Sequence, residues 1–333
     1  MCYTVGMIRK RWLSLLLLLP LLFSGCAARR ERFSRTWYDA FDTVVTLTAY
    51  AADEAAFARG AEAFEAELFR LHAVFDRYAP HEGVQGLYAL NAAGGEWVAV
   101  EPELYDLLGR LQAWGAGGAV EPALGGVIDL WTQARETGVL PDGEALAAAA
   151  AHADFAALEL SGGRARLTDP ETRLDLGASA KGYAAQLLRE TAAAHFDAYL
   201  IDAGGNVVCG PAADGGVWRV GVAAPDGGDV LLTLGVADMS VVTSGDSQRY
   251  FTVDGARYHH ILDPETLYPA RNMRQATIVA RDAGYADYLS TLLFLLPLEE
   301  ALETAEALEG VEAFFIANDG TLQMTSGAKG LML

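Results

Sequence analysis

A hairpin signal in the second half of the chain constrains the fold most. Tyr250–Val253 is a β-rich run, Asp254-Gly255 is a two-residue turn signal, and Arg257–Leu262 is the returning strand. Asp263-Pro264 ends that strand, because proline lacks a backbone donor and restricts the residue before it. The pattern predicts an antiparallel hairpin within residues 241–270 and therefore a fold with antiparallel sheet.

Polar residues surround this hairpin. Ser244-Gly245-Asp246 comes before it, small and polar enough for the backbone to approach a ligand closely. His259 and His260 are adjacent, so in a strand they point to opposite faces and at most one faces a given pocket. These residues indicate either a ligand site or, on composition alone, two polar residues on an ordinary hairpin.

The N-terminus carries a processing signal. Basic Arg9–Arg11 precede Trp12–Phe23, an apolar run that is short for a transmembrane helix. Phe23–Cys26 (FSGC) resembles a bacterial lipobox, whose cysteine is acylated and becomes the new N-terminus; the alternative is a plain signal peptide with a chance cysteine. We expect residues 1–25 to be a lipoprotein signal peptide, and a lipid on Cys26 to anchor the protein at the extracytoplasmic face of the bacterial cell membrane.

Charge and cysteine content narrow the functional classes. The chain has 333 residues and a net charge of −20, which falls to −23 without the three basic residues of the signal. Such a chain repels phosphate backbones, so we expect no nucleic-acid partner. Only Cys209 remains beside Cys26 in the mature chain, which excludes an internal disulfide and a cysteine-based zinc site. We expect residues 26–36 to form a basic tether and residues 37–333 a single domain.

Periodicity in the rest of the chain alternates between helix and strand, without internal repeats. It predicts strands at Phe41–Tyr50, Ala157–Thr168 (two), Ala198–Gly210 (two), Val217–Ala223, Val230–Val236, Ala276–Ala280, Val311–Ala317 and Thr321–Met324. It predicts helices at Asp53–Phe75, Pro102–Gly115, Asp142–His152 and Gly284–Leu296. We therefore expect a single α+β domain with mixed, largely antiparallel sheets and flanking helices.

A second polar stretch, Leu174–Glu190, reads as a strand that ends at Asp175, a glycine turn and a helix that begins near Lys181-Gly182. A helix N-terminus favours an anion, and Lys181 can reach a phosphate. The alternative is an ordinary strand-to-helix connection with a surface lysine.

An acidic residue interrupts the apolar helix at Gly284–Leu296. Asp287 and Thr291 are four residues apart and so share one helix face. A carboxylate among leucines is costly unless it is paired or bound to metal, and carboxylate plus hydroxyl oxygens suit magnesium. The alternative is an aspartate that only complements the helix dipole.

These stretches together resemble the ApbE family of FAD:protein FMN transferases. The motifs are FDTVVTL, Trp131 after a glycine-rich run, LDLGASAKGYA, IDAGGNV, TSGD, HHILDPET and ADYLSTLLF, in this order. Each is modestly specific, but seven in one order behind a lipobox are highly specific. The resemblance implies an α+β, T-fold-like domain that moves FMN from FAD onto a threonine of a partner protein and releases AMP. It implies, as partners, redox-complex subunits or extracellular flavoproteins with a Ser/Thr-Gly-Ala-Thr-like acceptor sequence.

The resemblance also implies metal ligands and a catalytic residue. The Ala178 backbone carbonyl, Asp287 and Thr291 match the positions that hold Mg²⁺. His260 matches the histidine of the HxxDPxT motif, which assists the transfer and is the candidate base by its titration range.

Six further positions match FAD-contacting residues of the family: Phe41, Tyr78, Glu121, Asp175, Lys181 and Leu262. Phe41 stands where the family usually has methionine, and Glu121 where aspartate is commoner. Leu267 replaces a glycine that usually follows DPxT, and Ser247 stands where an aromatic residue is common. The last two departures, Leu267 and Ser247, are expected to reshape the flavin or acceptor pocket without touching the metal ligands.

Three other functions remain as alternatives. A carrier lipoprotein would bind FAD without turnover, although storage needs no magnesium at the diphosphate. An FAD pyrophosphatase would use water in place of the acceptor hydroxyl. A solute-binding lipoprotein would need two repeated βαβ lobes, which the pattern does not show.

Overall fold

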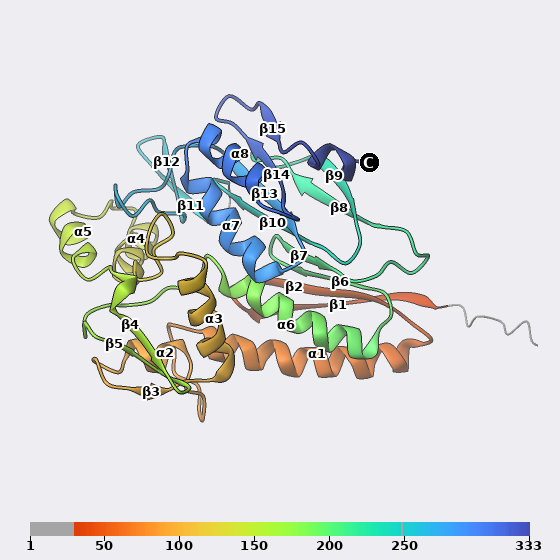
Figure 1. Ribbon diagram of the computed structural model, residues 1–333, viewed down its shortest axis with the longest axis horizontal. Helices are drawn as coiled ribbons and strands as arrows, with labels where there is room; N and C mark the ends of the chain where they lie inside the picture. Colours follow the sequence, from red (N-terminus) through yellow and green to blue (C-terminus); the bar gives the residue numbers. More distant parts are fainter. Residues whose placement is uncertain (1–29, 248) are drawn as a thin grey trace, which may run out of the picture.

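The computed structural model describes residues 30–247 and 249–333 (Figure 1). The predicted signal peptide, residues 1–25, and the predicted lipid attachment site, Cys26, lie outside the described residues. None of the helices in the described part of the chain combines the length and the apolarity needed to cross a bilayer.

An eight-stranded sheet forms the centre of the fold, in the order β1-β2-β6-β7-β10-β13-β14-β15. All seven neighbouring pairs are antiparallel. The strands are β1 (Glu31–Ala40), β2 (Thr43–Ala51), β6 (Tyr199–Ala203), β7 (Asn206–Cys209), β10 (Ser240–Gly245), β13 (Gln275–Ala280), β14 (Glu312–Ile316) and β15 (Leu322–Met324). The α+β architecture predicted from the sequence is confirmed.

Strand β1 corrects the predicted N-terminal boundary. The tether was expected to extend to residue 36, but residues 31–36 pair with β2, in a register that runs from Glu31 opposite Ala51 to Ala40 opposite Thr43. Trp37 from this strand is only 6% exposed and stacks on Phe64 of α1. The folded domain therefore begins at the edge strand of the main sheet.

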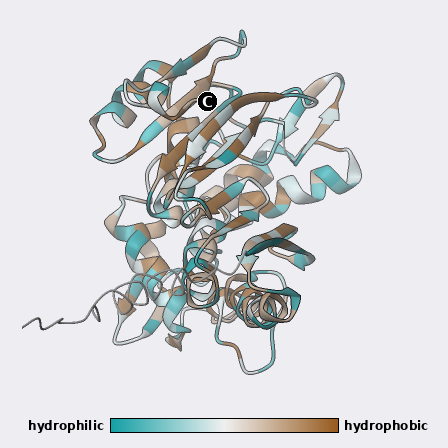
Figure 2. Ribbon diagram, turned by 90° about the vertical axis from the view of Figure 1, so that its right-hand side faces the viewer, coloured by the Kyte–Doolittle hydropathy of each residue, from teal (hydrophilic) through white to brown (hydrophobic). Residues whose placement is uncertain are grey.

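Helices cover one face of the sheet and a hairpin covers the other. Helices α1 (Glu54–Phe75), α6 (Ala180–His195) and α7 (Ala283–Leu295) lie side by side against this face of the sheet, and α8 (Leu298–Ala307) follows α7 (Figure 1). The opposite face packs against the hairpin of β8 (Trp218–Ala223) and β9 (Val230–Val236) and the 3₁₀ turn Ala328–Leu331. In Figure 2 the central strands are mostly brown and the peripheral turns teal, as expected for a sheet buried on both faces.

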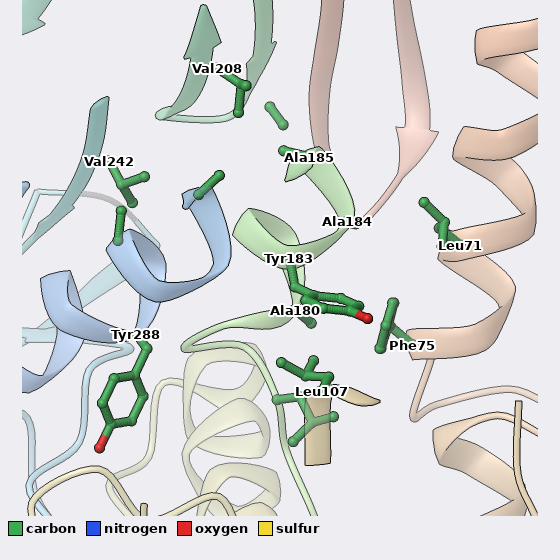
Figure 3. Close-up of a cluster of buried hydrophobic side chains, with 14 of the residues drawn as sticks. Leu71, Phe75, Leu107, Ala180, Tyr183, Ala184, Ala185, Val208, Val242 and Tyr288 are labelled. Atoms are coloured by element: carbon green, nitrogen blue, oxygen red, sulfur yellow. The ribbon is translucent and has the colours of Figure 1, made fainter. Parts of the chain in front are cut away.

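Helix α6 lies at the centre of the helical layer. Its Ala180, Tyr183, Ala184 and Ala185 point towards α1, α7 and the sheet, and Phe75 of α1 lies against the Tyr183 ring (Figure 3). Small side chains on α6 let the helices approach closely.

A smaller layer closes one end of the domain. It contains α2 (Leu87–Asn91), α3 (Pro102–Ala113), α4 (Gly125–Thr137), α5 (Gly143–Ala150), the sheet β3-β5-β4 (Val98–Ala99, Arg164–Leu167, Leu158–Ser161) and the 3₁₀ turn Phe155–Ala157. The predicted hairpin forms a separate two-stranded sheet, β11 (Tyr250–Val253) and β12 (Ala256–His259), with Phe251 and Tyr258 against Trp131 of α4. A cleft lies between this layer and the main sheet.

Several predictions of secondary structure were incomplete or wrong. The returning strand of the hairpin, expected to extend to Leu262, ends at His259. The glycine-rich stretch at 115–131 contains the start of α4, and α8 was not predicted at all. The strand expected to end at Asp175 does not form, because only Arg173 makes an isolated bridge, to Leu124. Residues 174–179 instead form the turn that leads into α6.

Candidate active site

Nine of the ten residues that the sequence selected line one cleft, although they come from distant segments. They are Tyr78, Glu121, Asp175, Ala178, Lys181, His260, Leu262, Asp287 and Thr291. The cleft lies where the ends of β7 and β10 meet the N-terminus of α6 and the buried face of α7. The structure shows that these residues lie together, and the role of each residue stays a prediction.

Asp287 is the most deeply buried charged residue of the cleft, at 3% exposure. Its Oδ2 accepts a hydrogen bond from the Gly182 amide at 2.8 Å, and its Oδ1 lies 4.0 Å from Nζ of Lys181. A Cβ on Gly182 would lie 2.4 Å from Cβ of Asp287, so only glycine allows this approach of α6 to α7. The backbone of α6 thus orients the carboxylate.

The donors beside Asp287 fit a hard cation. Thr291 lies one helical turn further along α7, and Ala178 lies in the turn before α6; both line the same cleft. A buried carboxylate with one oxygen fixed by an amide leaves the other oxygen for a ligand, and carboxylate, hydroxyl and carbonyl oxygens are the donors that Mg²⁺ prefers. The residues present therefore fit the predicted ion.

Asp175 supports the turn between Arg173 and α6. Its Oδ1 accepts the Gly177 amide at 2.8 Å, and its Oδ2 accepts Nη1 of Arg77 at 3.0 Å. Both oxygens already have partners within the protein, so Asp175 shapes the loop beside Ala178 and Lys181.

Arg77 was missed by sequence analysis and connects three segments beside the cleft. Its guanidinium is only 8% exposed and binds Asp175, Asp129 at 3.0 Å and the Gly125 carbonyl at 3.2 Å. Burial opposes the charge, but the carboxylates of Asp175 and Asp129 outweigh it and raise the pKa of Arg77. Nothing in the sequence pairs residue 77 with residue 175, because the contact spans long loops.

Replacing this buried cation should destabilise the protein. We expect Arg77→Met to lower the free energy of unfolding by about 3 kcal/mol, because it leaves the largely buried Asp175 carboxylate without its partner. Urea denaturation measures the change. Arg70→Met is the matched control, since the side chain of Arg70 is 40% exposed and its ion pairs should contribute less than about 1 kcal/mol. Equal losses in the two variants would contradict the structural role of Arg77.

The two adjacent histidines lie in different surroundings, although β12 ends at His259 and His260 follows it outside the strand. His259 is 3% exposed; its Nε2 lies 2.8 Å from the Ala270 carbonyl, and its ring packs edge-on against Phe294. Burial lowers the pKa of His259 and so favours its neutral form. His260 lines the cleft.

Glu121 and Tyr78 lie at the rim of the cleft. Glu121 accepts the Ala123 amide at 2.7 Å and the Phe155 amide at 3.4 Å, and burial raises its pKa. Tyr78 is 67% exposed, and the guanidinium of Arg77 lies 5.1 Å from its ring centroid. Glu121 thus holds the backbone at Ala123 and Phe155 in place, whereas the exposed ring of Tyr78 can contact a ligand.

Phe41 is the selected residue that does not line the cleft. It has a left-handed backbone (φ 54°), its amide donates to Nδ1 of His72 at 3.3 Å, and its ring contacts His72 and Phe75. The turn places the next residues, Asp42 and Thr43, in the cleft instead. Phe41 is therefore next to the cleft residues in the chain, but its ring packs on α1.

Leu267, the departure from a family glycine, also has a left-handed backbone, with φ of 62°. Such a φ favours glycine, which explains the commoner residue at this position. The carbonyl of Leu267 accepts Nε1 of Trp131 at 2.8 Å, and its amide donates to the Asp263 carbonyl at 2.8 Å. These two bonds hold the conformation at a leucine. Ser247 lies in the turn after β10.

Asn206 is a second residue that sequence analysis missed. It lines the cleft from the start of β7, is 2% exposed, and its Nδ2 has no hydrogen-bond partner among the described residues. Its place in the motif IDAGGNV was the available signal, but only the fold shows that it faces the cleft.

Comparison with known proteins assigns the class. The model of the ApbE family matches residues 41–315, so the chain belongs to the ApbE family. An FAD:protein FMN transferase of Treponema pallidum is 37% identical over 264 residues, 72% of this chain and 73% of that protein. One from Rhodobacter capsulatus is 32% identical over 306 residues, which cover 88% of this chain but 57% of that protein.

Solved structures agree with this assignment. The crystal structure of the ApbE protein of Thermotoga maritima superposes with a TM-score of 0.82 at 29% identity and covers 91% of this chain and 100% of that chain. The apo form of the flavinyl transferase ApbE of Pseudomonas stutzeri gives a TM-score of 0.75 at 26% identity and covers 91% and 96%.

Proposed function

We propose that this protein transfers FMN from FAD to a target protein. Family membership and relatives named FAD:protein FMN transferase support this function. The single structural observation that carries it is the buried Asp287 carboxylate, oriented by Gly182 beside Lys181 within a cleft. A carrier that only stores FAD has no need of such an arrangement, since its diphosphate stays intact.

We further propose that the transfer depends on Mg²⁺ held by the Ala178 carbonyl, Asp287 and Thr291. The bound ion supplies Lewis-acid stabilisation for the negative charge of the diphosphate. Lys181 adds a fixed cation: its Nζ lies 4.0 Å from Asp287 and donates to the Gly177 carbonyl at 3.4 Å. Catalysis of phosphoryl transfer depends mainly on positive charge that is already positioned at the phosphate oxygens before the reaction begins.

The proposed acceptor is a threonine hydroxyl of the target protein. Its oxygen attacks the FMN phosphorus, the bond from that phosphorus to the bridging oxygen breaks, and AMP leaves with that oxygen. His260 receives the hydroxyl proton, which ends on a phosphate oxygen of AMP or in solvent. The product is a phosphoester between FMN and the target, and water in place of threonine gives FMN and AMP.

We also propose that the protein works at the extracytoplasmic face of the membrane, attached by a lipid on Cys26. The lipobox-like FSGC at 23–26 supports this location. Its targets would be redox-complex subunits or extracellular flavoproteins with a Ser/Thr-Gly-Ala-Thr-like sequence. The folded domain begins at Glu31, so only a short segment separates Cys26 from β1.

Incubation with FAD, Mg²⁺ and a peptide that contains the acceptor sequence tests the function. We expect the peptide to gain the mass of FMN minus water, together with one AMP per modified peptide. A peptide with alanine in place of the acceptor threonine is the control. FAD bound without AMP release would support the carrier, and AMP with an unmodified peptide would support the pyrophosphatase.

A further inference from the structure

A second group of ligand-type side chains lies outside the cleft. His72 lies in the last turn of α1, Asp76 caps the C-terminus of that helix, and His81 follows in the next loop. One nitrogen of each histidine and one oxygen of Asp76 lie within 4.8 Å of one another. None of the three lines the cleft that holds Asp287.

The backbone fixes the carboxylate of this group. Oδ1 of Asp76 accepts the amides of Tyr78 at 2.7 Å and Ala79 at 3.4 Å. Its Oδ2 lies 2.8 Å from Nε2 of His81. One oxygen therefore supports the loop while the other faces an imidazole. This is the arrangement in which outer hydrogen bonds orient a metal ligand.

The two imidazoles are close and accessible to solvent. Their ring centroids are 5.7 Å apart, with the rings inclined at 72°. The side chain of His81 is 32% exposed and that of Asp76 11%, so an ion can enter without unfolding the loop. Burial lowers the pKa of His72, so protons compete less with a metal ion for its ring nitrogen.

We propose that His72, Asp76 and His81 form a binding site for a first-row divalent transition ion, with Zn²⁺ as the matching metal. Two imidazoles and one carboxylate are a usual zinc ligand set and leave a further position for water. The harder Mg²⁺ prefers oxygen ligands and suits the Asp287 site instead. The protein would thus carry two metal sites of different chemistry.

The ion would act on the cleft through two short connections. Asp76 and His81 enclose the loop that places Tyr78 at the rim. His72 accepts the amide of Phe41, which precedes the cleft residue Asp42. A neutral imidazole has one lone pair, so an ion bound through either nitrogen of His72 removes the hydrogen bond to Phe41. Occupancy should therefore fix the Tyr78 loop and release the turn at Phe41–Asp42.

Zinc binding by the full-length protein tests the proposal. Isothermal titration with Zn²⁺ in excess Mg²⁺, which occupies hard-oxygen sites, should give one Zn²⁺ per chain. His81→Ala and Asp76→Asn should each weaken this binding at least roughly tenfold, because even the loss of a group that only orients a ligand costs about 10- to 100-fold in metal affinity. The Asp76→Asn variant keeps an oxygen for the Tyr78 amide, so its fold should persist, as circular dichroism can verify.

Two controls separate this site from others. His152→Ala removes a histidine that pairs with Asp169 at 2.7 Å on the surface, and it should leave Zn²⁺ binding unchanged. Asp287→Asn should also leave it unchanged, so that failure of this site and failure of the transferase site are distinguishable. Co²⁺ in place of Zn²⁺ should give visible d–d absorption that His81→Ala removes. The proposal is overturned if the wild type binds neither ion, or if both ligand variants bind Zn²⁺ as the wild type does.

Discussion

Asp287→Asn should lower the rate of FMN transfer roughly a thousand-fold, because the loss of metal-based charge stabilisation is worth several kcal/mol. The amide keeps the shape of the side chain and an oxygen for the Gly182 amide, which now donates to Oδ2 at 2.8 Å. It loses the negative charge that holds a cation and that faces Lys181 at 4.0 Å. The transfer rate is measured from the mass of the acceptor peptide over time at saturating FAD and Mg²⁺.

Asp282→Asn is the matched control for this variant. Asp282 caps the same helix, α7, by accepting the Tyr285 amide at 2.9 Å, and it does not line the cleft. Asparagine caps helices as well as aspartate does, so stability and transfer should both stay near wild type. Transfer at a normal rate by Asp287→Asn, with Mg²⁺ still required, would show that the ion binds elsewhere.

The position of Asp287 could be predicted because the helix around it has a strong pattern. The sequence of α7 is almost wholly apolar, so an aspartate and a threonine four residues apart are conspicuous and must share a face. The hairpin of β11 and β12 was equally clear, since Asp254-Gly255 sits between two β-rich runs. Local patterns of this kind determined both the elements and the candidate ligands.

Other elements lack such a pattern. Strand β1 carries four charged residues in the sequence ERFSRTWYDA, and it forms because β2 supplies its partner along almost its whole length. Helix α4 begins at two glycines, which have low helix propensity; Gly125 is required there because a Cβ would lie 2.4 Å from the Arg173 carbonyl. In both cases tertiary contacts outweigh local preference.

The parts of the candidate site that the sequence did not predict also depend on tertiary contacts. Nine of the residues selected by family resemblance line one cleft. The resemblance did not identify Arg77, whose partners are Asp175, Asp129 and the Gly125 carbonyl. It also assigned Phe41 to FAD, whereas the left-handed turn brings Asp42 and Thr43 to the cleft. Contacts between loops and the direction of a strained turn depend on the folded backbone and cannot be deduced from spacing.

His260→Ala should slow the transfer between roughly a hundred-fold and ten thousand-fold, the usual contribution of a general base, while FAD binding changes little. His260 directly follows β12 and lines the cleft, whereas His259 at the end of that strand is buried against Phe294. Single-turnover transfer at saturating FAD measures the chemical step, and quenching of flavin fluorescence measures FAD affinity separately. His152→Ala, on the outer surface, is the control and should change neither quantity.

The pH dependence distinguishes a base from a binding group. An imidazole must be neutral to accept the threonine proton, so wild-type transfer should be slow in acid, where His260 is protonated, and should level off once the imidazole is neutral. The alanine variant should lose this rise and keep only the slow rate of proton transfer to water. If the variant instead binds FAD weakly but reacts at the wild-type rate once saturated, His260 contacts the substrate without accepting the proton. The base must then be sought among the other groups of the cleft, because the hydroxyl cannot attack phosphorus efficiently with its proton in place.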